Sequence, residues 1–256
     1  MKKKIGNIGL LAMLFSLFAC EMELNPYAEE TNHVSFVYEK ASDTLVRYTF
    51  AYQQSSVLVD TVWLRATVVG QLSPQARKIK IEQLFLDGID NAEVGVHFEP
   101  FQEHYVIEAN ATGVDVPIIL KRDVSLLEKE YVLGIQLKST NDFELVSSQN
   151  TLKQVVFSDI LLKPKTWGGA ADNYFLEYGY EKHKLMIDVA AEYGVVVDDA
   201  WIEEVVKDYG YVMFWQSVFD AALLRENELR KSQGLEALKE GPEYGNIEVQ
   251  FKYNWF

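Results

Sequence analysis

Hydrophobic and polar residues alternate along most of residues 34–163, where short β-branched and aromatic runs are separated by turn residues. A period of two is typical of strands that bury one face and expose the other. The clearest run, residues 56–69, places Val62 and Leu64 on one face and Trp63 on the other. This pattern predicts an N-terminal antiparallel β-sandwich of the immunoglobulin-like kind. The runs are residues 34–38, 44–53, 56–69, 78–82, 94–98, 104–107, 114–120, 131–138 and 153–161.

Beyond these runs the hydrophobic period lengthens toward 3.6, so the sequence predicts a small, mainly helical part over residues 164–256. Pro164 and the paired glycines that follow it mark the boundary. The two patterns together predict an α+β protein in which the helical part packs on a sandwich domain of residues 34–163.

Three helices are expected in the helical part. They span residues 180–192, a segment that follows the capping pair Asp198-Asp199, and residues 211–232. The longest carries a hydrophobic stripe and few lysines, which predicts burial against protein rather than against a membrane surface. The stripe consists of Trp215, Val218, Phe219, Ala222 and Leu223. Residues 247–251 alternate again and predict a terminal strand.

The N-terminal segment has the pattern of an export signal. Lysines occupy positions 2–4, residues 8–18 are almost entirely apolar, and Ala19 stands directly before Cys20. A basic start, a short apolar run and a small residue at the end predict a signal peptide over residues 1–19. Residues 17–20 form a lipobox, so we expect Cys20 to be lipidated and to anchor the chain to a membrane. Residues 20–33 then form the lipidated cysteine and a flexible, acidic tether.

Composition narrows the chemistry. Cys20 is the only cysteine in 256 residues, so the folded part has no cysteine for a disulfide, a thiolate metal site or a nucleophile. The formal net charge of -14 makes nucleic acid a poor partner, because binding to phosphates requires basic residues.

Four segments carry a resemblance to known proteins. The first is the export signal that ends at Cys20, and the second is residues 116–122 with the following residues 126–129 and 141–143. The third runs from Phe157-Ser158-Asp159 through Trp167, Phe175, Tyr178 and Lys182, and the fourth includes Asn227 and residues 245–251.

On these residues the chain resembles a family of functionally uncharacterised Bacteroidetes surface lipoproteins, a domain of unknown function often encoded in nutrient- and glycan-uptake loci. The resemblance implies an outer-membrane location at the cell surface and an uptake complex as a partner, and it brings no established chemistry. The sequence departs from the family at Leu176, where glycine is usual, at Gly179, where serine is usual, and at His183 in place of a common tyrosine.

No catalytic or metal-binding spacing stands out. The histidines at positions 33, 97, 104 and 183 match no zinc motif, and His97 and His104 are more simply explained as ordinary polar residues than as a ligand pair. The acidic residues of the helical part suit helix caps and a solvated face better than a glycosidase pair. They are Asp198, Asp199, Glu203, Glu204 and Asp220. We therefore expect no catalytic residue, no metal and no cofactor.

Trp63 is the best candidate for ligand binding, because sugars stack their apolar faces on exposed aromatic rings with polar groups at the edges. It is flanked by Thr61 and Arg65, and it is exposed if the alternation of this strand is right. The interpretation that we favour is instead that the helical part covers this face and makes Trp63 interdomain core.

Three hypotheses for function follow from these patterns. The first is a non-catalytic accessory lipoprotein that binds a glycan, with Trp63 and Arg65 as the candidate contacts, or that joins a polysaccharide- or nutrient-uptake complex. The second is a glycan-degrading enzyme whose carboxylates converge only in the fold, and the third is a structural or assembly scaffold. An exposed aromatic platform favours the first, and a cleft that holds two carboxyl groups favours the second.

Overall fold

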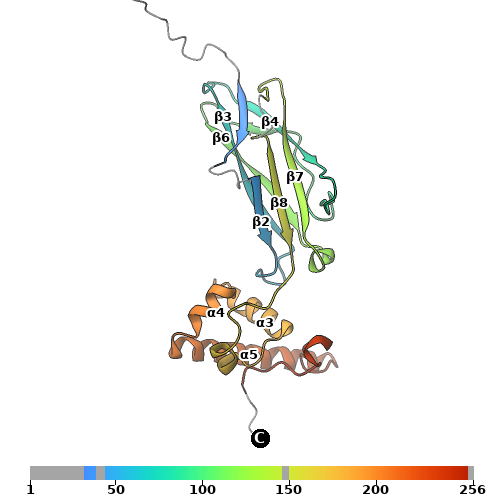
Figure 1. Ribbon diagram of the computed structural model, residues 1–256, viewed down its shortest axis with the longest axis vertical. Helices are drawn as coiled ribbons and strands as arrows, with labels where there is room; N and C mark the ends of the chain where they lie inside the picture. The colour runs from blue at the N-terminus through green and yellow to red at the C-terminus, as the bar shows by residue number, and fades with distance from the viewer. Residues whose placement is uncertain (1–31, 39–43, 146–149, 253–256) are drawn as a thin grey trace, which may run out of the picture.

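The structure, a computed structural model, describes residues 32–38, 44–145 and 150–252. Strands form one end of the molecule and helices form the other (Figure 1). The strands are β1 (His33–Phe36), β2 (Leu45–Thr49), β3 (Val59–Val69), β4 (Arg77–Leu84), β5 (Tyr105–Ile107), β6 (Gly113–Lys121), β7 (Tyr131–Lys138) and β8 (Leu152–Ser158). The helices are α2 (Ala170–Phe175), α3 (Tyr180–Ala191), α4 (Asp199–Val205) and α5 (Tyr209–Ser232), with 3-10 turns η3 (Val124–Leu127) and η4 (Pro242–Tyr244).

The strands form two sheets, with the orders β1-β3-β6 and β2-β8-β7-β4-β5. Every pair is antiparallel except β2 and β8, which run parallel. The expectation of a purely antiparallel sandwich is therefore wrong at this edge. The reason is that β1 and β2 follow one another down the same side of the sandwich, one in each sheet (Figure 1).

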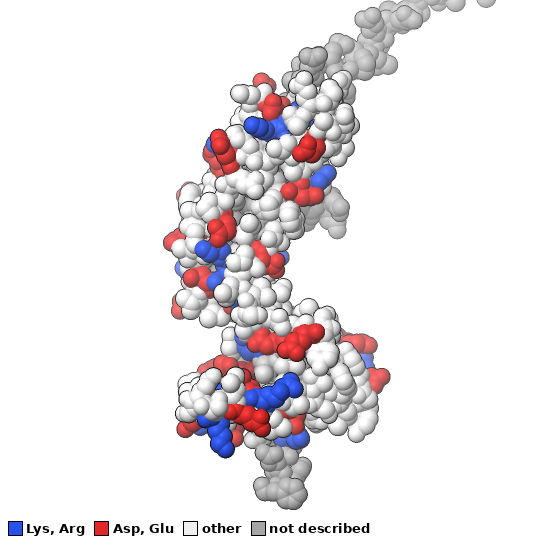
Figure 2. All heavy atoms as spheres, turned by 180° about the vertical axis from the view of Figure 1, so that it is seen from behind, with Lys and Arg blue, Asp and Glu red and all other residues white. Residues whose placement is uncertain are grey.

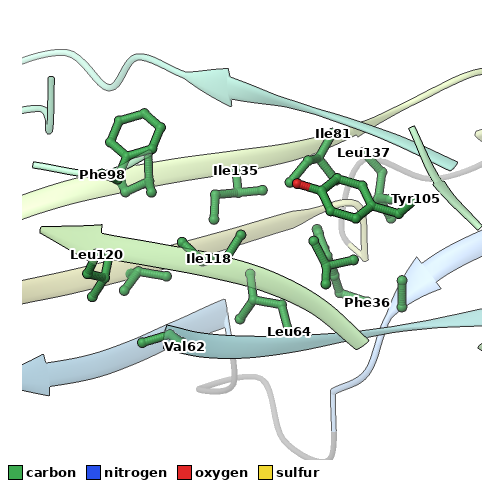
Figure 3. Packing of buried hydrophobic residues seen from close by; sticks show 14 of the residues in the cluster. Phe36, Val62, Leu64, Ile81, Phe98, Tyr105, Ile118, Leu120, Ile135 and Leu137 are labelled. Carbon is green, nitrogen blue, oxygen red and sulfur yellow. The ribbon is translucent and has the colours of Figure 1, made fainter. Parts of the chain in front are cut away.

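The sandwich core lies between the two sheets and is largely aliphatic, with aromatic side chains such as Phe36 and Phe98 among the aliphatic ones. Leu64 and Ile118 of one sheet point toward Ile135 and Leu137 of the other (Figure 3). The inner face of β3 consists of Val62, Leu64 and Ala66, as the alternation predicted. Burial of this face stabilises the sheet, because β-branched side chains on neighbouring strands contact one another in the core.

A second core lies within the helical part and includes the buried rings of Trp167, Trp215 and Phe219. The stripe prediction for α5 is confirmed, because Trp215, Phe219, Ala222 and Leu223 are buried. The helix begins two residues earlier than expected, since Asp208 accepts a hydrogen bond from the backbone nitrogen of Tyr211 and caps it. Asp198 caps α4 in the predicted way, through the backbone nitrogen of Trp201.

Two alternating segments are not strands. Residues 247–251 make a single bridge, between Glu248 and Lys239, although Val249 and Phe251 are buried. Residues 94–98 form a tight loop closed by a bridge from Val94 to Phe98. In both places the alternation is real, but no neighbouring segment runs alongside for long enough to form a ladder.

A network of hydrogen bonds joins the helical part to the end of the sandwich. Arg122, just after β6, donates from Nε and Nη2 to the two carboxylate oxygens of Asp159, each at 2.7 Å. Its Nη1 donates to the backbone oxygen of Gln54 at 2.8 Å. Ser55 in turn binds the carboxylate of Asp188 in α3, at 2.6 Å through its backbone nitrogen and 2.8 Å through Oγ. The helices therefore lie beyond the end of the sheets rather than across a sheet face (Figure 1).

Candidate functional site

Trp63 lies in the middle of β3, on the outer face of the three-stranded sheet. Its side chain is 63% exposed, although tryptophan is the largest apolar side chain. The alternation of β3 turns it outward, because Val62 and Leu64 on either side are buried in the core.

The interpretation that Trp63 is interdomain core is wrong. It assumed that the helices cover the outer face of this sheet, whereas they pack at the end of the sandwich, where Gln54 and Ser55 hydrogen-bond to Asp188 of α3. Packing inside the protein therefore does not account for a tryptophan at this position.

The neighbours of Trp63 form a flat, mostly uncharged strip. Pro117 of β6 is its cross-strand partner, and Thr61 on β3 is opposite Ile119. Cross-strand partners on one face lie close together, so the register places Pro117 beside Trp63. Farther along, Val59 is half exposed. The strip thus offers an aromatic ring with aliphatic and hydroxyl groups beside it.

Ion pairs stand at both ends of this strip. Arg65 Nη1 contacts Asp115 Oδ2 at 2.9 Å, and both side chains are largely exposed. At the other end, Lys121 contacts Glu99 at 3.6 Å. On the molecular face shown in Figure 2, acidic and basic side chains of the sandwich likewise gather in small groups of mixed sign. Exposed pairs of this kind contribute little to stability, so their groups are available to hydrogen-bond a ligand.

The histidines occupy structural positions. His97 is buried, accepts a hydrogen bond at Nδ1 from the backbone nitrogen of Glu93 and lies 2.9 Å from Ser125 Oγ through Nε2. Burial lowers the pKa of His97. His104 lies 3.8 Å from Glu103. Within residues 32–38, 44–145 and 150–252, no three histidine, cysteine or acidic side chains are grouped to hold a metal ion.

The acidic residues of the helical part are engaged in local contacts. Asp198 caps α4, and Asp199 accepts hydrogen bonds from the backbone nitrogen and Oγ1 of Thr166, each at 3.1 Å. Glu203 and Glu204 both contact Lys207. A further pair, at 2.5 Å, joins Asp220 to Lys252. These contacts fit the prediction of caps and a solvated face.

Residues that carried the family resemblance hold the turn between α2 and α3. Lys182 is buried, and its Nζ donates to the backbone oxygens of Phe175 at 2.9 Å and Glu177 at 2.5 Å. Burial lowers its pKa to about 8, although the carboxylate of Glu240 opposes the shift. The ammonium group ends α2 by binding its last carbonyl groups, which is a structural role.

An exposed aromatic cluster in the helical part was not recognised from the sequence. Tyr193, just after α3, and Tyr211 and Phe214 of α5 surround the buried ring of Trp215. The only available signal was that Tyr211 and Phe214 lie on α5 beside the hydrophobic stripe. Their exposure could not be predicted from the sequence, because a residue at the edge of a hydrophobic stripe is buried or exposed according to what packs against it in the fold.

Cys20, the predicted signal peptide and residues 21–31 of the predicted tether lie outside the described residues. Over the residues that the structure describes, no helix is both long enough and apolar enough to cross a membrane.

The two sheets and the helical end define a mixed α+β protein with a sandwich-like N-terminal part. The family described as a domain of unknown function, DUF4843, matches residues 27–192, and the chain belongs to this family. The match includes all eight strands and the helices through α3. It confirms the resemblance to a functionally uncharacterised family. No curated protein matches the chain.

Several solved structures are similar to part of the chain. The apo-form Calx CBD1 domain is 13% identical, with a TM-score of 0.37 over 50% of this chain and 97% of that domain. A "putative carbohydrate binding protein" from Bacteroides ovatus is 13% identical, with a TM-score of 0.38 over 50% of this chain and 37% of its own length. A two-domain protein of unknown function from Bacteroides fragilis is 13% identical, with a TM-score of 0.35 over 61% of this chain and 51% of its own. TM-scores this low assign no ligand and no activity to the chain.

Proposed function

We propose that the protein is a non-catalytic, lipid-anchored accessory protein of the outer membrane, exposed at the cell surface, and that it binds a glycan through the sheet face around Trp63. The observation that carries the proposal is the largely exposed indole ring at the centre of an open sheet. An exposed tryptophan lowers solubility and does not contribute to the core, and ligand binding would account for its position here.

The chemistry of the strip suits a sugar chain. The indole face stacks on the C–H face of a pyranose ring, and the flat sheet leaves room for further sugar units on either side. Arg65 and Asp115 lie at the edge of the strip and present hydrogen-bond donors and acceptors to hydroxyl groups. Because the two charges pair with each other, the strip as a whole favours an uncharged glycan.

The anchor is Cys20 of the lipobox, and this assignment rests on the sequence alone. The position of β1 supports an outward-facing arrangement. His33, the first residue of β1, pairs with Val69, which is the end of β3 farthest from the helices. The other end of β3, at Val59, lies next to the helical part. A chain tethered through its N-terminus therefore holds the helical part away from the membrane, with the Trp63 face along the side (Figure 1).

We also infer that the sandwich is immunoglobulin-like, and the strand order supports this. Strands β1, β3 and β6 match the A, B and E strands of that fold, and β4, β7 and β8 match C, F and G in their sheet order. For the alternative of a glycan-degrading enzyme, the carboxylates of α4 and α5 are the candidates. Their engagement in caps and ion pairs supports the non-catalytic reading.

The test is a glycan-array screen of the purified mature chain, followed by titration of the glycan that binds best. We expect Trp63→Ala to weaken binding about tenfold, the loss that one stacking contact makes. Trp63→Phe keeps a ring and should retain part of the affinity. Phe85→Ala is the matched control, since Phe85 is 70% exposed but lies after β4 on the other sheet. Equal affinity of the Trp63→Ala and Phe85→Ala variants would contradict the proposed site.

A further inference from the structure

The aromatic cluster at the start of α5 is a second group of exposed aromatic side chains, after Trp63, that are not part of a core. Tyr193 is 57% exposed and Phe214 is 50% exposed, and Tyr211 beside them is also exposed. In Figure 2 the end of the helical part where α4 and the start of α5 lie is a broad surface with few charged side chains, and acidic and basic groups gather at its outer edge.

Contacts with the buried Trp215 hold these three rings in place. The ring centroids of Tyr193, Phe214 and Tyr211 lie 5.4, 5.5 and 6.2 Å from that of Trp215, all in edge-to-face geometry. Trp215 itself stacks on Phe219 in the core. A surface whose rings are already positioned loses little conformational entropy when a partner binds.

The segment that leads from Tyr193 to the start of α5 is acidic. Residues 192–208 contain six acidic residues and a single basic one, Lys207. That lysine contacts both Glu203 and Glu204, so its charge is compensated locally. Glu192 directly precedes Tyr193, and the carboxylate of Asp208 caps the turn that carries Tyr211.

This combination selects the chemistry of the partner. An acidic rim repels anionic lipid headgroups, and surfaces that bind membranes are usually rich in Lys and Arg. Exposed tyrosine and phenylalanine rings bind Arg and Lys side chains through cation–π contacts, and carboxylates beside them add charge complementarity. Aromatic residues are also the usual anchors of protein interfaces.

We propose that the surface of Tyr193, Tyr211 and Phe214 docks a partner protein through a basic segment that presents Arg or Lys. The surface lies in the helical part, at the opposite end of the molecule from β1 (Figure 1). A partner that reached this end would leave the Trp63 face uncovered. The inference does not rest on glycan binding.

The experiment measures the binding of a fluorescein-labelled hexa-arginine peptide to the purified mature chain by anisotropy, with hexa-glutamate as the second probe. Phe214→Ala and Tyr211→Ala are expected to weaken hexa-arginine binding about fivefold each, and hexa-glutamate should not bind. Leu235→Ala is the matched control, because Leu235 is 51% exposed in the same acidic part but beyond the other end of α5. Its affinity for hexa-arginine should equal that of the wild type. Thermal unfolding of each variant checks that the fold is retained.

Several results would overturn the proposal. Absence of hexa-arginine binding, or equal weakening in all three variants, would leave only general attraction to an acidic protein. Binding to phosphatidylglycerol vesicles that Phe214→Ala abolishes would assign the surface to a membrane instead. A concentration-dependent dimer in sedimentation velocity that Phe214→Ala dissociates would assign it to a second copy of the chain.

Discussion

The sandwich and the helical part achieve burial in different ways. The sandwich core is largely aliphatic, and its backbone groups pair in two sheets. The helical core holds a similar number of buried aromatic side chains, but its rings contact one another, as Trp215 and Phe219 do. Both parts enclose polar residues, among them Arg77 and His97 in the sandwich and Lys182, His183 and Glu240 in the helical part. Among the described side chains, the buried polar atoms without a hydrogen-bond partner are Tyr38 Oη in the sandwich and five in the helical part, from Asp172, Tyr178, His183, Trp201 and Trp215.

This difference locates the sensitive region of the molecule. The buried polar side chains of the sandwich mostly have hydrogen-bond partners, and Tyr38 Oη is the exception among its described residues. Large rings packed edge to face carry N–H and O–H groups that need partners when they are buried, and those of Tyr178, Trp201 and Trp215 have none. The helical part should therefore respond more strongly to single polar substitutions and to the protonation of His183.

The largest expected effect tests whether the two cores unfold together. Phe219 is fully buried in the helical core, so Phe219→Ala should cost about 3 to 5 kcal/mol of unfolding free energy. Leu64→Ala makes the corresponding cavity in the sandwich. Tryptophan fluorescence reports mainly on the helical part, which holds Trp167, Trp201 and Trp215, and circular dichroism at the strand minimum reports on the sandwich.

We expect both probes to give the same lowered midpoint in each variant, because Gln54 and Ser55 of the sandwich hydrogen-bond to Asp188 of the helical part. A fluorescence transition that shifts alone in Phe219→Ala would mean that the helical part unfolds independently. The comparison of the two cores would then describe two separate units.

Much of the fold could be predicted where the deciding contacts are local. On β3 the alternation was enough to assign Val62 and Leu64 to the core. On α5 the helical period was enough to assign Trp215 and Phe219, and Asp198 was recognisable as a cap. In these cases the periodicity of the sequence indicates which face is buried, and that is sufficient to assign the core residues of the element.

The candidate sites depended on distant parts of the chain. The exposure of Trp63 follows from where the helices dock, which depends on the contacts of Gln54 and Ser55 with Asp188, and no local pattern gives that position. The cluster of Tyr193 and Phe214 likewise forms only when the end of α3 meets α5. Alternation at residues 94–98 and 247–251 predicted strands, but these segments have no partner strand among the described residues. A hydrophobic pattern indicates which face is buried and does not indicate which segment lies alongside.

The next effect sharpens the comparison through pH. His183 is fully buried, and its Nε2 donates to the backbone oxygen of Val197 at 2.8 Å, which leaves Nδ1 unprotonated and without a partner. Burial lowers the pKa of His183 from 6.5 to about 4, against the opposing charge of Asp199. The rings of Tyr52, Trp167 and Tyr178 pack against it and Lys184 adds a positive charge nearby, so protonation is poorly compensated.

Because the unfolded chain binds this proton more readily than the folded one, stability is full above pH 6.5 and falls as the pH approaches 4. The loss should reach about 3 kcal/mol, the value of a pKa difference of this size. Urea unfolding at pH 7, 5.5 and 4 measures it. His183→Gln keeps a donor for Val197 and does not titrate, so its stability should change less over this range. An identical pH dependence in the variant and the wild type would show that other groups are responsible.

The smallest expected effect concerns how α3 is capped from a distance. Gly179 is the N-cap residue and has no side chain to bind the free N–H groups of the first turn. The carboxylate of Glu240 does so instead, accepting from the backbone nitrogens of Glu181 at 2.8 Å and Lys182 at 3.0 Å. Glu240 is held there by the segment around Lys239 and Glu248, which makes its single bridge at this point.

A side chain at position 179 would collide with this distant cap. A Cβ atom there would stand 1.9 Å from Glu240 Oε1, so Gly179→Ala must displace the carboxylate, and we expect it to cost about 1 kcal/mol. Gly179→Ser also displaces Glu240, but its hydroxyl group caps the helix itself, as the serine usual in the family would, and it should cost less. The decisive measurement is a double-mutant cycle with Glu240→Ala in urea unfolding. Glu240→Ala should destabilise the wild type and leave Gly179→Ser nearly unchanged, because the two caps serve the same N–H groups. Additive losses would mean that Glu240 stabilises the helical part by some contact other than the cap.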